Sequence, residues 1–372
     1  MKVVHLNKLF INTKINRTLK VIYFLVLVTL IFLDILVVFF LPQVGLGALV
    51  AYSACVEGNH AFVTTNDGTV ILDISNPVNP RKIGIVATSD GAFGVTVKDD
   101  LAYIASDSNG FIIANISDPE NPLITDQYND GGSAHSVCTN GSYAYVTEYP
   151  QGMEIFDIST PDDIIKVTEY DDGGVFRGVA IKNNFIYLPD SGRGLKVLNV
   201  TDPSSPKLVS TSLLTHGAID VYIHNDLLFL GCHGHGVYIF DISTPHSPIQ
   251  LGKYYKLGGE AYGVTGNTTH LYVADLQKGV YILNITDPSH PKEISEYSNA
   301  APHDIFWNDK KIFLADQDKR LIILDEHLEP LFTGFQRDIS LQLFLIAVTL
   351  VVGSILPIYW FRKFLQLGQK ES

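Results

Sequence analysis

One phrase recurs along this chain at a nearly constant interval, and it limits the folds that the chain can adopt. The phrase has an Asp or Asn, then Ile or Val, then Ser or Thr, with a proline shortly afterwards. Its seven copies begin at Asp73, Asn115, Asp157, Asn199, Asp241, Asn284 and, in the worn form DEHLEP, Asp325. Subtracting successive positions gives intervals of 42, 42, 42, 42, 43 and 41 residues. A fixed period of this length with strand-like content is typical of propeller blades.

Each repeat contains four short segments that are typical of β-strands. In the second repeat they are FGVTV (93–97), LAYIAS (101–106), GFIIANIS (110–117) and PLITDQY (122–128). They are rich in Val, Ile, Tyr and Phe and are separated by turn residues. We therefore predict an all-β fold over residues 43–338, a seven-bladed β-propeller of four-stranded antiparallel blades. Because the blades are whole at both ends, the ring should close without exchanging a strand.

The repeated phrase has a structural explanation at the end of each third strand. An Asp or Asn side chain accepts a hydrogen bond from the backbone N–H two residues later, which fixes a turn. The Ser or Thr offers a second local hydrogen bond, and proline removes a donor so that the strand ends. The phrase therefore predicts a corner in every blade and not a repeated catalytic site.

The third strands themselves carry a family resemblance. They read TVILD, MEIFD, LKVLN, VYIFD and LIILD, and each is followed by the corner. This pattern resembles the LVIVD-repeat family, a group of prokaryotic β-propeller repeats, over about residues 48–336. The resemblance implies a fold and often a surface location. It implies no established reaction, so no catalytic residue is assigned. The seventh repeat departs from the pattern, because Glu326 and His327 replace the usual pair.

Two apolar segments flank the repeats. Residues 21–42 and 339–361 are each long enough to cross a bilayer as a helix. The flanking basic residues are Lys2, Lys8, Lys14, Arg17 and Lys20 before the first segment and Arg362, Lys363 and Lys370 after the second. The positive-inside rule then predicts cytoplasmic tails at 1–20 and 362–372, with the propeller outside the plasma membrane. A cleaved signal peptide is the alternative for the first segment. The small-residue stretch AYSAC lies within the first predicted strand, which favours an uncleaved anchor.

Asp34 lies inside the first apolar segment, where a charge is costly. It is expected to be protonated or paired, either with Thr349 of the second segment or with a basic residue of another membrane protein. A single tolerated acid in a very apolar helix is the remaining alternative.

The charge balance differs between the repeats and the tails. Residues 43–338 contain 18 Lys and Arg against 37 Asp and Glu, which gives a net charge of −19. This argues against nucleic acid and anionic lipid as partners. It is compatible with a basic partner or a divalent cation, although no cofactor is required. Solubility alone is the simpler explanation.

The direction of the chain places several polar and aromatic residues at one mouth of the central channel. The starts of the first strands and the ends of the second strands should meet there. The residues proposed to bind a ligand at this mouth are Tyr52, Phe93, His135, Arg177, Tyr262, His303, Glu148, Asp190, Asp275 and Asp316. Aromatic rings beside carboxylates suit a sugar or a cation. A water-filled channel with polar lining is the alternative.

The fifth repeat contains the loop GCHGHG, with Cys232, His233 and His235, and His216 precedes it in a neighbouring loop. Thiolate and imidazole are ligands that zinc or copper prefers. The spacing matches no standard zinc signature, so a flexible histidine-bearing loop is the alternative.

Five N-x-Ser/Thr sequons fall on the opposite, distal face. They are Asn115, Asn140, Asn199, Asn267 and Asn284. They fit an exported glycoprotein. Equally, exchange of Asp for Asn at a turn creates such a sequon without any selection for glycans.

Three classes of function follow from these features. The favoured one is a membrane-anchored, cell-surface module that binds a protein or glycan without catalysis. The second is a hydrolase or lyase at the mouth, using His135 or His303 with nearby carboxylates, although no motif fixes their geometry. The third is a subunit or sensor of a membrane complex that contacts its partner through Asp34. Substitutions at the mouth, on the distal face and at Asp34 would distinguish these three classes of function.

Overall fold

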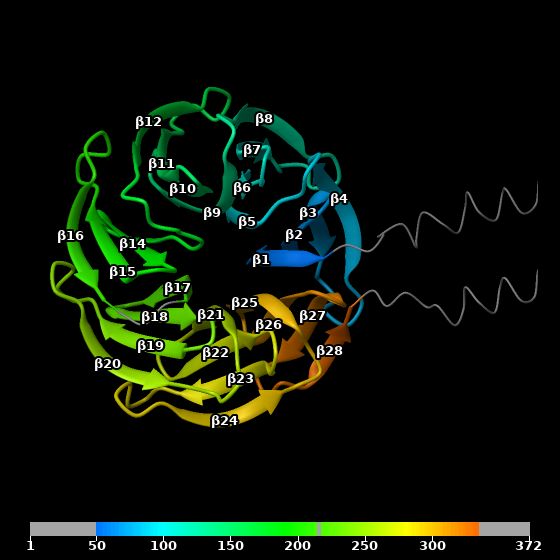
Figure 1. Ribbon diagram of the computed structural model, residues 1–372. Helices are drawn as coiled ribbons and strands as arrows, with labels where there is room; N and C mark the ends of the chain where they lie inside the picture. Colours follow the sequence, from blue (N-terminus) through cyan, green and yellow to red (C-terminus); the bar gives the residue numbers. More distant parts are fainter. Residues whose placement is uncertain (1–49, 214–216, 335–372) are drawn as a thin grey trace, which may run out of the picture. The chain divides into compact units, whose positions relative to one another are not determined.

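The computed structural model describes residues 50–213 and 217–334, and they form a ring of seven four-stranded antiparallel sheets (Figure 1). The strands of blades 1 to 4 are β1 (Ala51–Glu57), β2 (His60–Thr65), β3 (Gly68–Asp73), β4 (Arg81–Ala87), β5 (Gly94–Lys98), β6 (Leu101–Ala105), β7 (Phe111–Asn115), β8 (Leu123–Tyr128), β9 (Ser133–Asn140), β10 (Tyr143–Tyr149), β11 (Gly152–Asp157), β12 (Ile165–Tyr170), β13 (Ala180–Lys182), β14 (Phe185–Asp190), β15 (Gly194–Asn199) and β16 (Lys207–Ser212). The strands of blades 5 to 7 are β17 (Ala218–His224), β18 (Leu227–Cys232), β19 (Gly236–Asp241), β20 (Ile249–Tyr254), β21 (Ala261–Gly266), β22 (His270–Asp275), β23 (Gly279–Asn284), β24 (Lys292–Tyr297), β25 (Pro302–Asn308), β26 (Lys311–Asp316), β27 (Arg320–Asp325) and β28 (Pro330–Thr333). The prediction of a seven-bladed propeller is confirmed.

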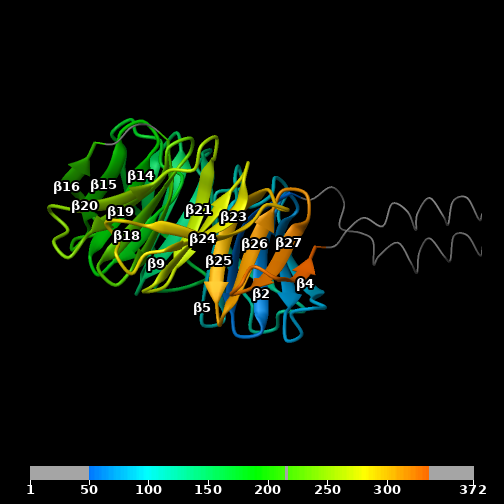
Figure 2. The ribbon, with the colours of Figure 1, turned by 90° about the horizontal axis from the view of Figure 1, so that it is seen from below.

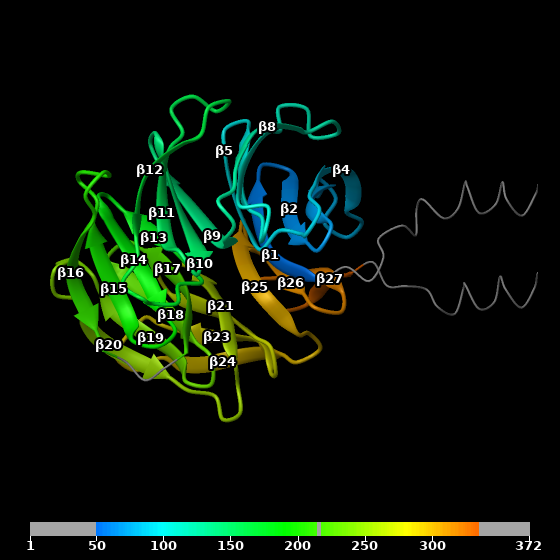
Figure 3. The ribbon, with the colours of Figure 1, turned by 45° about the horizontal axis from the view of Figure 1, so that its top comes forward.

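The ring closes by packing blade 7 against blade 1. Each blade uses four consecutive strands, so no strand is exchanged between the described blades. β1 lies beside both β5 and β25, as Figure 3 shows. At this junction the Ser53 hydroxyl donates to Asp304 Oδ2 at 2.6 Å. The predicted closure without a strand swap is therefore correct.

The repeated corner has the predicted hydrogen bonds and one more. In blade 1 the Ser75 N–H donates to Asp73 Oδ1 at 2.9 Å. The residue between them is also fixed, because the Ile74 N–H donates to the Asn59 carbonyl in the turn between β1 and β2, at 2.8 Å. The equivalent apolar residues Ile116, Ile158, Val200, Ile242 and Ile285 make the same backbone bond and are buried. In blades 1 to 6 the phrase thus ties the third strand to the first hairpin of its own blade.

The core lies between blades rather than within one blade. Side chains of a strand point alternately to its two faces. In β11, Phe156 packs with Tyr103 and Phe111 of blade 2. Its neighbour Ile155 packs with Phe176 of blade 4. Both faces of a third strand are therefore covered, which explains why these strands are buried along almost their whole length. Figure 2 shows blades 6 and 7 side by side in this arrangement.

The predicted membrane segments, residues 21–42 and 339–361, lie outside the described residues, together with Asp34, Thr349 and both tails. Within residues 50–213 and 217–334 no helix is long and apolar enough to cross a membrane.

The closeness of neighbouring blades can be tested at Gly252 in β20. A Cβ at this position would lie 2.1 Å from the Pro288 carbonyl oxygen, in the corner of blade 6. We expect Gly252→Ala to lower the free energy of unfolding by about 1–3 kcal/mol, because the two blades must separate to make room. Urea unfolding of the full-length chain in detergent measures this.

Gly231→Ala is the matched control, because the nearest atom to its Cβ would be 3.5 Å away. We expect a small effect there, and equal losses in both variants would contradict the explanation from close packing.

Candidate functional site

A β-bulge recurs at the start of the first strand and presents one side chain at the channel mouth. In blades 1, 5, 6 and 7 the register of the first hairpin shifts around one residue, which has no partner in the ladder. These unpaired residues are Tyr52, Ile219, Tyr262 and His303, and His135 holds the same place in blade 3. A bulge redirects a side chain away from the regular alternation of the strand. Of the predicted mouth residues, Tyr52, His135, Tyr262 and His303 thus leave the regular alternation of their strands.

The aromatic mouth residues form a continuous arc of ring contacts over blades 5, 6, 7, 1, 2 and 3. His135 stacks on Phe93 with centroids 4.9 Å apart and ring planes 5° apart. Phe93 contacts Tyr52 edge to face at 4.8 Å, and Tyr52 lies 5.7 Å from His303. The arc continues from His303 to Tyr262 at 6.0 Å and from Tyr262 to His233 at 5.7 Å. The structure therefore brings the predicted aromatic residues together at this mouth.

Two carboxylates lie one residue deeper in the channel. Asp304 accepts from Ser53, and Asp220 Oδ2 accepts from the Val264 N–H at 2.9 Å. Burial, with the nearby charge of Asp304, raises the pKa of Asp220 to about 7, and burial raises the pKa of Asp304 to about 6. Gly263 lies between the two blades, where a Cβ would come 2.9 Å from the Asp304 Cα. This layer holds the first strands together and gives the channel acidic groups below the rings.

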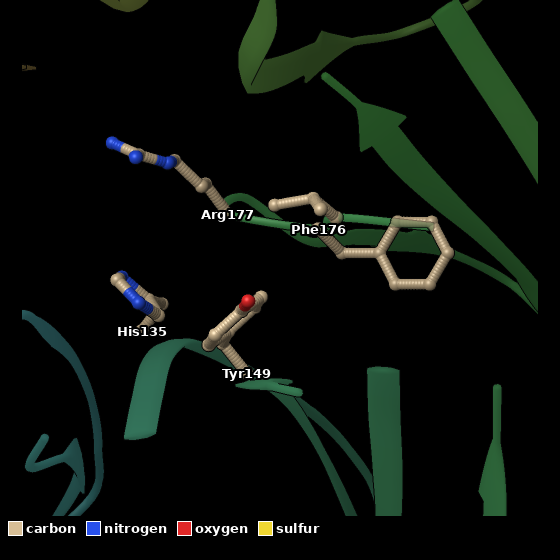
Figure 4. Close-up of a pocket in the computed structure, with 5 residues that line it drawn as sticks. His135, Tyr149, Phe176 and Arg177 are labelled. Atoms are coloured by element: carbon tan, nitrogen blue, oxygen red, sulfur yellow. The ribbon is translucent and has the colours of Figure 1, made fainter. Parts of the chain in front are cut away.

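Arg177 ends the arc beside a pocket between blades 3 and 4. The pocket has a volume of roughly 190 Å³ and is lined by His135, Tyr149, Val175, Phe176 and Arg177 (Figure 4). Tyr149 is 56% exposed and Phe176 is buried. Burial and the charge of Arg177 lower the pKa of His135, so its ring is neutral at pH 7. The pocket thus combines flat apolar walls with one guanidinium.

The carboxylates at the ends of the second strands lie behind the mouth rather than at it. Glu148, Asp190, Asp275 and Asp316 are all at most 4% exposed. Asp316 accepts from the backbone N–H groups of Ala301, at 2.7 Å, and Lys319. Asp275 and Asp190 likewise accept from N–H groups in the turns that follow them. Their placement on this side of the ring agrees with the sequence analysis, but the three aspartates make the contacts of turn-fixing groups.

Blade 3 holds a cluster of two buried carboxylates and one exposed carboxylate that the sequence analysis did not identify. Oxygens of Asp130, Glu148 and Glu154 lie within 4.8 Å of one another, a spacing that could suit a hard cation. Lys166 from β12 already fills this role, because its ammonium pairs with Asp130 at 2.9 Å and with Glu154. Burial and pairing with Glu148 raise the pKa of Glu154 to about 9, so these two acids share a proton at neutral pH.

Blade 4 uses the equivalent positions differently. Lys196 occupies the place of Glu154, one repeat later, and its side chain is 2% exposed. Its ammonium pairs with Asp172 at 2.6 Å and with Asp190 at 2.7 Å. It also lies 4.9 Å from the centroid of the Phe176 ring. Each cluster is therefore paired with a lysine of its own blade.

The predicted Cys–His metal loop is not assembled in the described part of the chain. Cys232 is fully buried, its thiol faces the Leu230 carbonyl, and burial raises its pKa to about 12. His233 is instead exposed, with Nε2 3.4 Å from Glu260. His235 Nδ1 contacts the His233 carbonyl at 3.0 Å, and His216 lies outside the described residues. The cluster of blade 3 is the group with metal-ligand spacing among residues 50–213 and 217–334.

The five sequons lie in turns, as predicted, and their side chains have turn functions. The side-chain oxygens of Asn115, Asn199, Asn267 and Asn284 accept from the Ser or Thr backbone N–H two residues later. Asn140 instead donates to the Asn183 carbonyl of the next blade at 2.7 Å. These contacts explain the Asn residues as turn formers, and glycosylation stays a prediction.

Tyr149, Val175 and Phe176 were missed as pocket residues because the pocket depends on how blades 3 and 4 meet.

A signal for the buried clusters was present in the sequence. The third residue of β11 and β15 is charged, whereas the equivalents in other blades are Val70, Ile112, Tyr238, Tyr281 and Ile322. A charge in a position that is otherwise uncharged predicts a buried partner.

Comparison with known proteins gives a family and a fold. The family model described as "LVIVD repeat" matches residues 51–88, 91–130, 131–172, 173–213 and 258–299, which together are more than half of the chain. The structure adds blades 5 and 7, which that model does not match. No curated protein matches the chain.

Three solved structures share the propeller fold at low sequence identity. The β-propeller domain of Myceliophteria thermophila Cps50 (Swd1) is 9% identical with a TM-score of 0.60, covering 72% of this chain and 93% of that one. The computationally designed Ika8 protein is 7% identical with a TM-score of 0.57, covering 75% and 96%. BamB from Moraxella catarrhalis is 14% identical with a TM-score of 0.52, covering 73% and 82%. Identities this low support the fold alone.

The ion pairs of Lys196 lead to a stability prediction. Lys196→Met keeps much of the side-chain volume but leaves Asp190 buried without its counter-ion. We expect a loss of about 3–5 kcal/mol in the free energy of unfolding, which is typical when one partner of a buried pair is removed. Urea unfolding measures it. Lys292→Met, at an exposed lysine of β24, is the control and should change stability little; a similar loss there would count against the ion-pair explanation.

The proton shared by Glu148 and Glu154 leads to a prediction of pH dependence. The pKa of Glu154 is higher in the folded chain than its ordinary value of 4.5, so the folded state binds the extra proton. This stabilisation is present at low pH and is lost as the pH rises toward 9, by up to about 1.4 kcal/mol per pH unit.

Glu154→Gln resembles the protonated acid and should weaken this dependence when urea midpoints at pH 5.5 and 8.5 are compared. Glu120→Gln, at an exposed glutamate, should retain the slope of the unchanged chain. Identical slopes for all three chains would refute the shared proton.

Proposed function

Because the chain belongs to the LVIVD-repeat family of propeller proteins, we propose that it is a non-catalytic binding module that holds its ligand at the channel mouth. One observation carries the proposal: the arc of six rings that runs from His233 to His135 and ends beside Arg177. A concave surface lined by aromatic side chains with a few polar groups is typical of ligand sites.

The bulges support this proposal. A residue that only fills the core follows the alternation of its strand, whereas the bulged residues have left the ladder. Bulges are over-represented beside functional sites, where they redirect a side chain. The recurrence of aromatic residues at these released positions is what a binding surface requires, because aromatic rings supply large contact area at low entropic cost.

We further propose that residues 21–42 and 339–361 anchor the propeller at the outer side of the plasma membrane, as their hydropathy and flanking charges predict. β1 begins and β28 ends on the mouth face of the ring. An anchored propeller would therefore have its mouth on the side from which the chain enters and leaves. This favours a slender ligand, such as a glycan chain, over a whole globular protein.

Glycan binding by the full-length chain in detergent tests the proposal. A panel of immobilised neutral and acidic oligosaccharides identifies a ligand, and Phe93→Ala then removes the ring at the centre of the arc. We expect binding to weaken about 10-fold or more, as for other buried aromatic anchors. Val78→Ser, at an exposed corner residue of the distal face, is the control and should retain affinity.

Binding that is retained in Phe93→Ala but weakened in Val78→Ser would indicate adhesion through the distal face. Turnover of a bound glycan that depends on His135 or His303 would indicate the enzyme alternative. Co-purification of a membrane protein that is lost on Asp34→Leu would indicate the complex subunit.

A further inference from the structure

We propose that the pocket between blades 3 and 4 binds one carboxylated sugar unit of a glycan, a uronic acid residue, with its carboxylate on Arg177. The inference rests on the proposed function and adds the chemical class of the ligand. It follows from the charge, the walls, the rigidity and the size of this pocket.

Arg177 has a free guanidinium in a strongly acidic protein. It is exposed, and no carboxylate lies within ion-pair distance of it among residues 50–213 and 217–334. Three other cations of blades 3 and 4 are engaged differently: Lys166, Lys196 and Arg193 pair with aspartates or glutamates. A guanidinium presents a planar set of donors that matches a carboxylate with two parallel hydrogen bonds. The pocket therefore selects an anionic group.

The remaining walls suit a ring with an apolar face. The rings of His135 and Tyr149 lie on the side of the pocket opposite Arg177 (Figure 4). His135 is neutral at pH 7, so it does not compete with Arg177 as a second cation. The C–H face of a pyranose packs on aromatic faces, and its hydroxyls point outward to water. A carboxylated pyranose thus satisfies both sides of the pocket at once.

The site is held rigidly before any ligand binds. Phe176 is 2% exposed and anchors the segment before Arg177 in the core of blades 3 and 4. The hydroxyl of Thr147, itself fully buried, donates to the Arg177 carbonyl at 3.2 Å. His135 is fixed by its parallel stack on Phe93. Pre-organised groups lose little conformational entropy on binding, which is a requirement for recognising a small ligand.

The dimensions favour one unit of a longer chain. At roughly 190 Å³ the pocket is smaller than the 300–1,000 Å³ or so that is usual for drug-sized ligands. The aromatic arc continues from His135 to Phe93 and Tyr52, so neighbouring sugar units would lie on these rings. The net charge of −19 over residues 43–338 opposes a dense polyanion. We therefore expect an oligosaccharide with few acidic units rather than a heavily sulfated polymer.

Isothermal titration of the full-length chain in detergent tests the inference with two ligands that differ only in charge. Tetragalacturonate and tetramannuronate are each compared with their fully methyl-esterified forms, which keep the length and linkage but remove the carboxylates. We expect at least one free acid to bind at least about 10-fold more tightly than its ester, as for hydrogen bonds to charged groups. Arg177→Gln should abolish this difference, and Arg193→Gln, at the arginine paired with Asp172, should retain it. The corresponding monomeric uronate shows whether one unit is sufficient.

Several results would overturn the inference. Equal affinity for acid and ester would remove the role of Arg177, and so would an acid preference that survives Arg177→Gln. Glycan binding at the arc would still stand if Phe93→Ala abolishes that binding. Binding of a peptide with a free terminal carboxylate, but of no uronate, would replace the sugar by a peptide. No binding of any acid or ester refutes the uronate assignment. The proposed function itself fails only if no glycan of the wider panel depends on Phe93.

Discussion

The covering of each third strand on both faces is the constraint on which the rest of the ring depends. A single blade would expose two apolar faces to water, as the opposite packing of Ile155 and Phe156 shows. Each blade is therefore stable only between two neighbours, which is the general condition of repeat proteins. A ring satisfies it for all seven blades without capping repeats. This is why blade 7 can lose part of the corner motif and still fold: its position is fixed by blades 6 and 1.

In five of the seven blades, a bulge releases one residue from this constraint. Along a regular strand every second side chain would have to enter an inter-blade core. At the mouth the extra residue has no partner in the ladder, and Tyr52, Tyr262 and His303 contact one another there instead of following the alternation of their strands. The residues of the next layer are tightly constrained by packing. Gly263, for example, leaves the space that Asp304 requires. Fold and binding surface thus occupy successive residues of the same strand.

Much of the fold was predictable because it depends on local, repeated patterns. The period gives the number of blades, and the corner motif contains its own hydrogen-bond donors and acceptors. The first-strand residues at the mouth were also predictable, since strand direction alone places them on one face. The burial of Glu148, Asp190, Asp275 and Asp316 was not, because depth depends on the adjacent loop that covers each acid. The pairing of Glu154 with Lys166 joins two neighbouring strands of blade 3, and the shared repeat pattern does not predict it, because the position of Glu154 is uncharged in five other blades.

The boundary between blades 3 and 4 departs most from the repeat, and this departure bears on function. An ideal seven-fold ring would offer seven equivalent sites at its mouth, with no difference in charge among them. Here the third position of the third strand is Glu154 in blade 3 and Lys196 in blade 4, while it is uncharged in the other five blades. Both side chains are paired inside their own blades, and neither contacts the guanidinium of Arg177. Stability alone does not explain these buried ion pairs, because burying charges is costly and uncharged residues occupy the same position in the other blades. At the same boundary, Arg177 places a guanidinium beside the aromatic arc, where a carboxylate could bind.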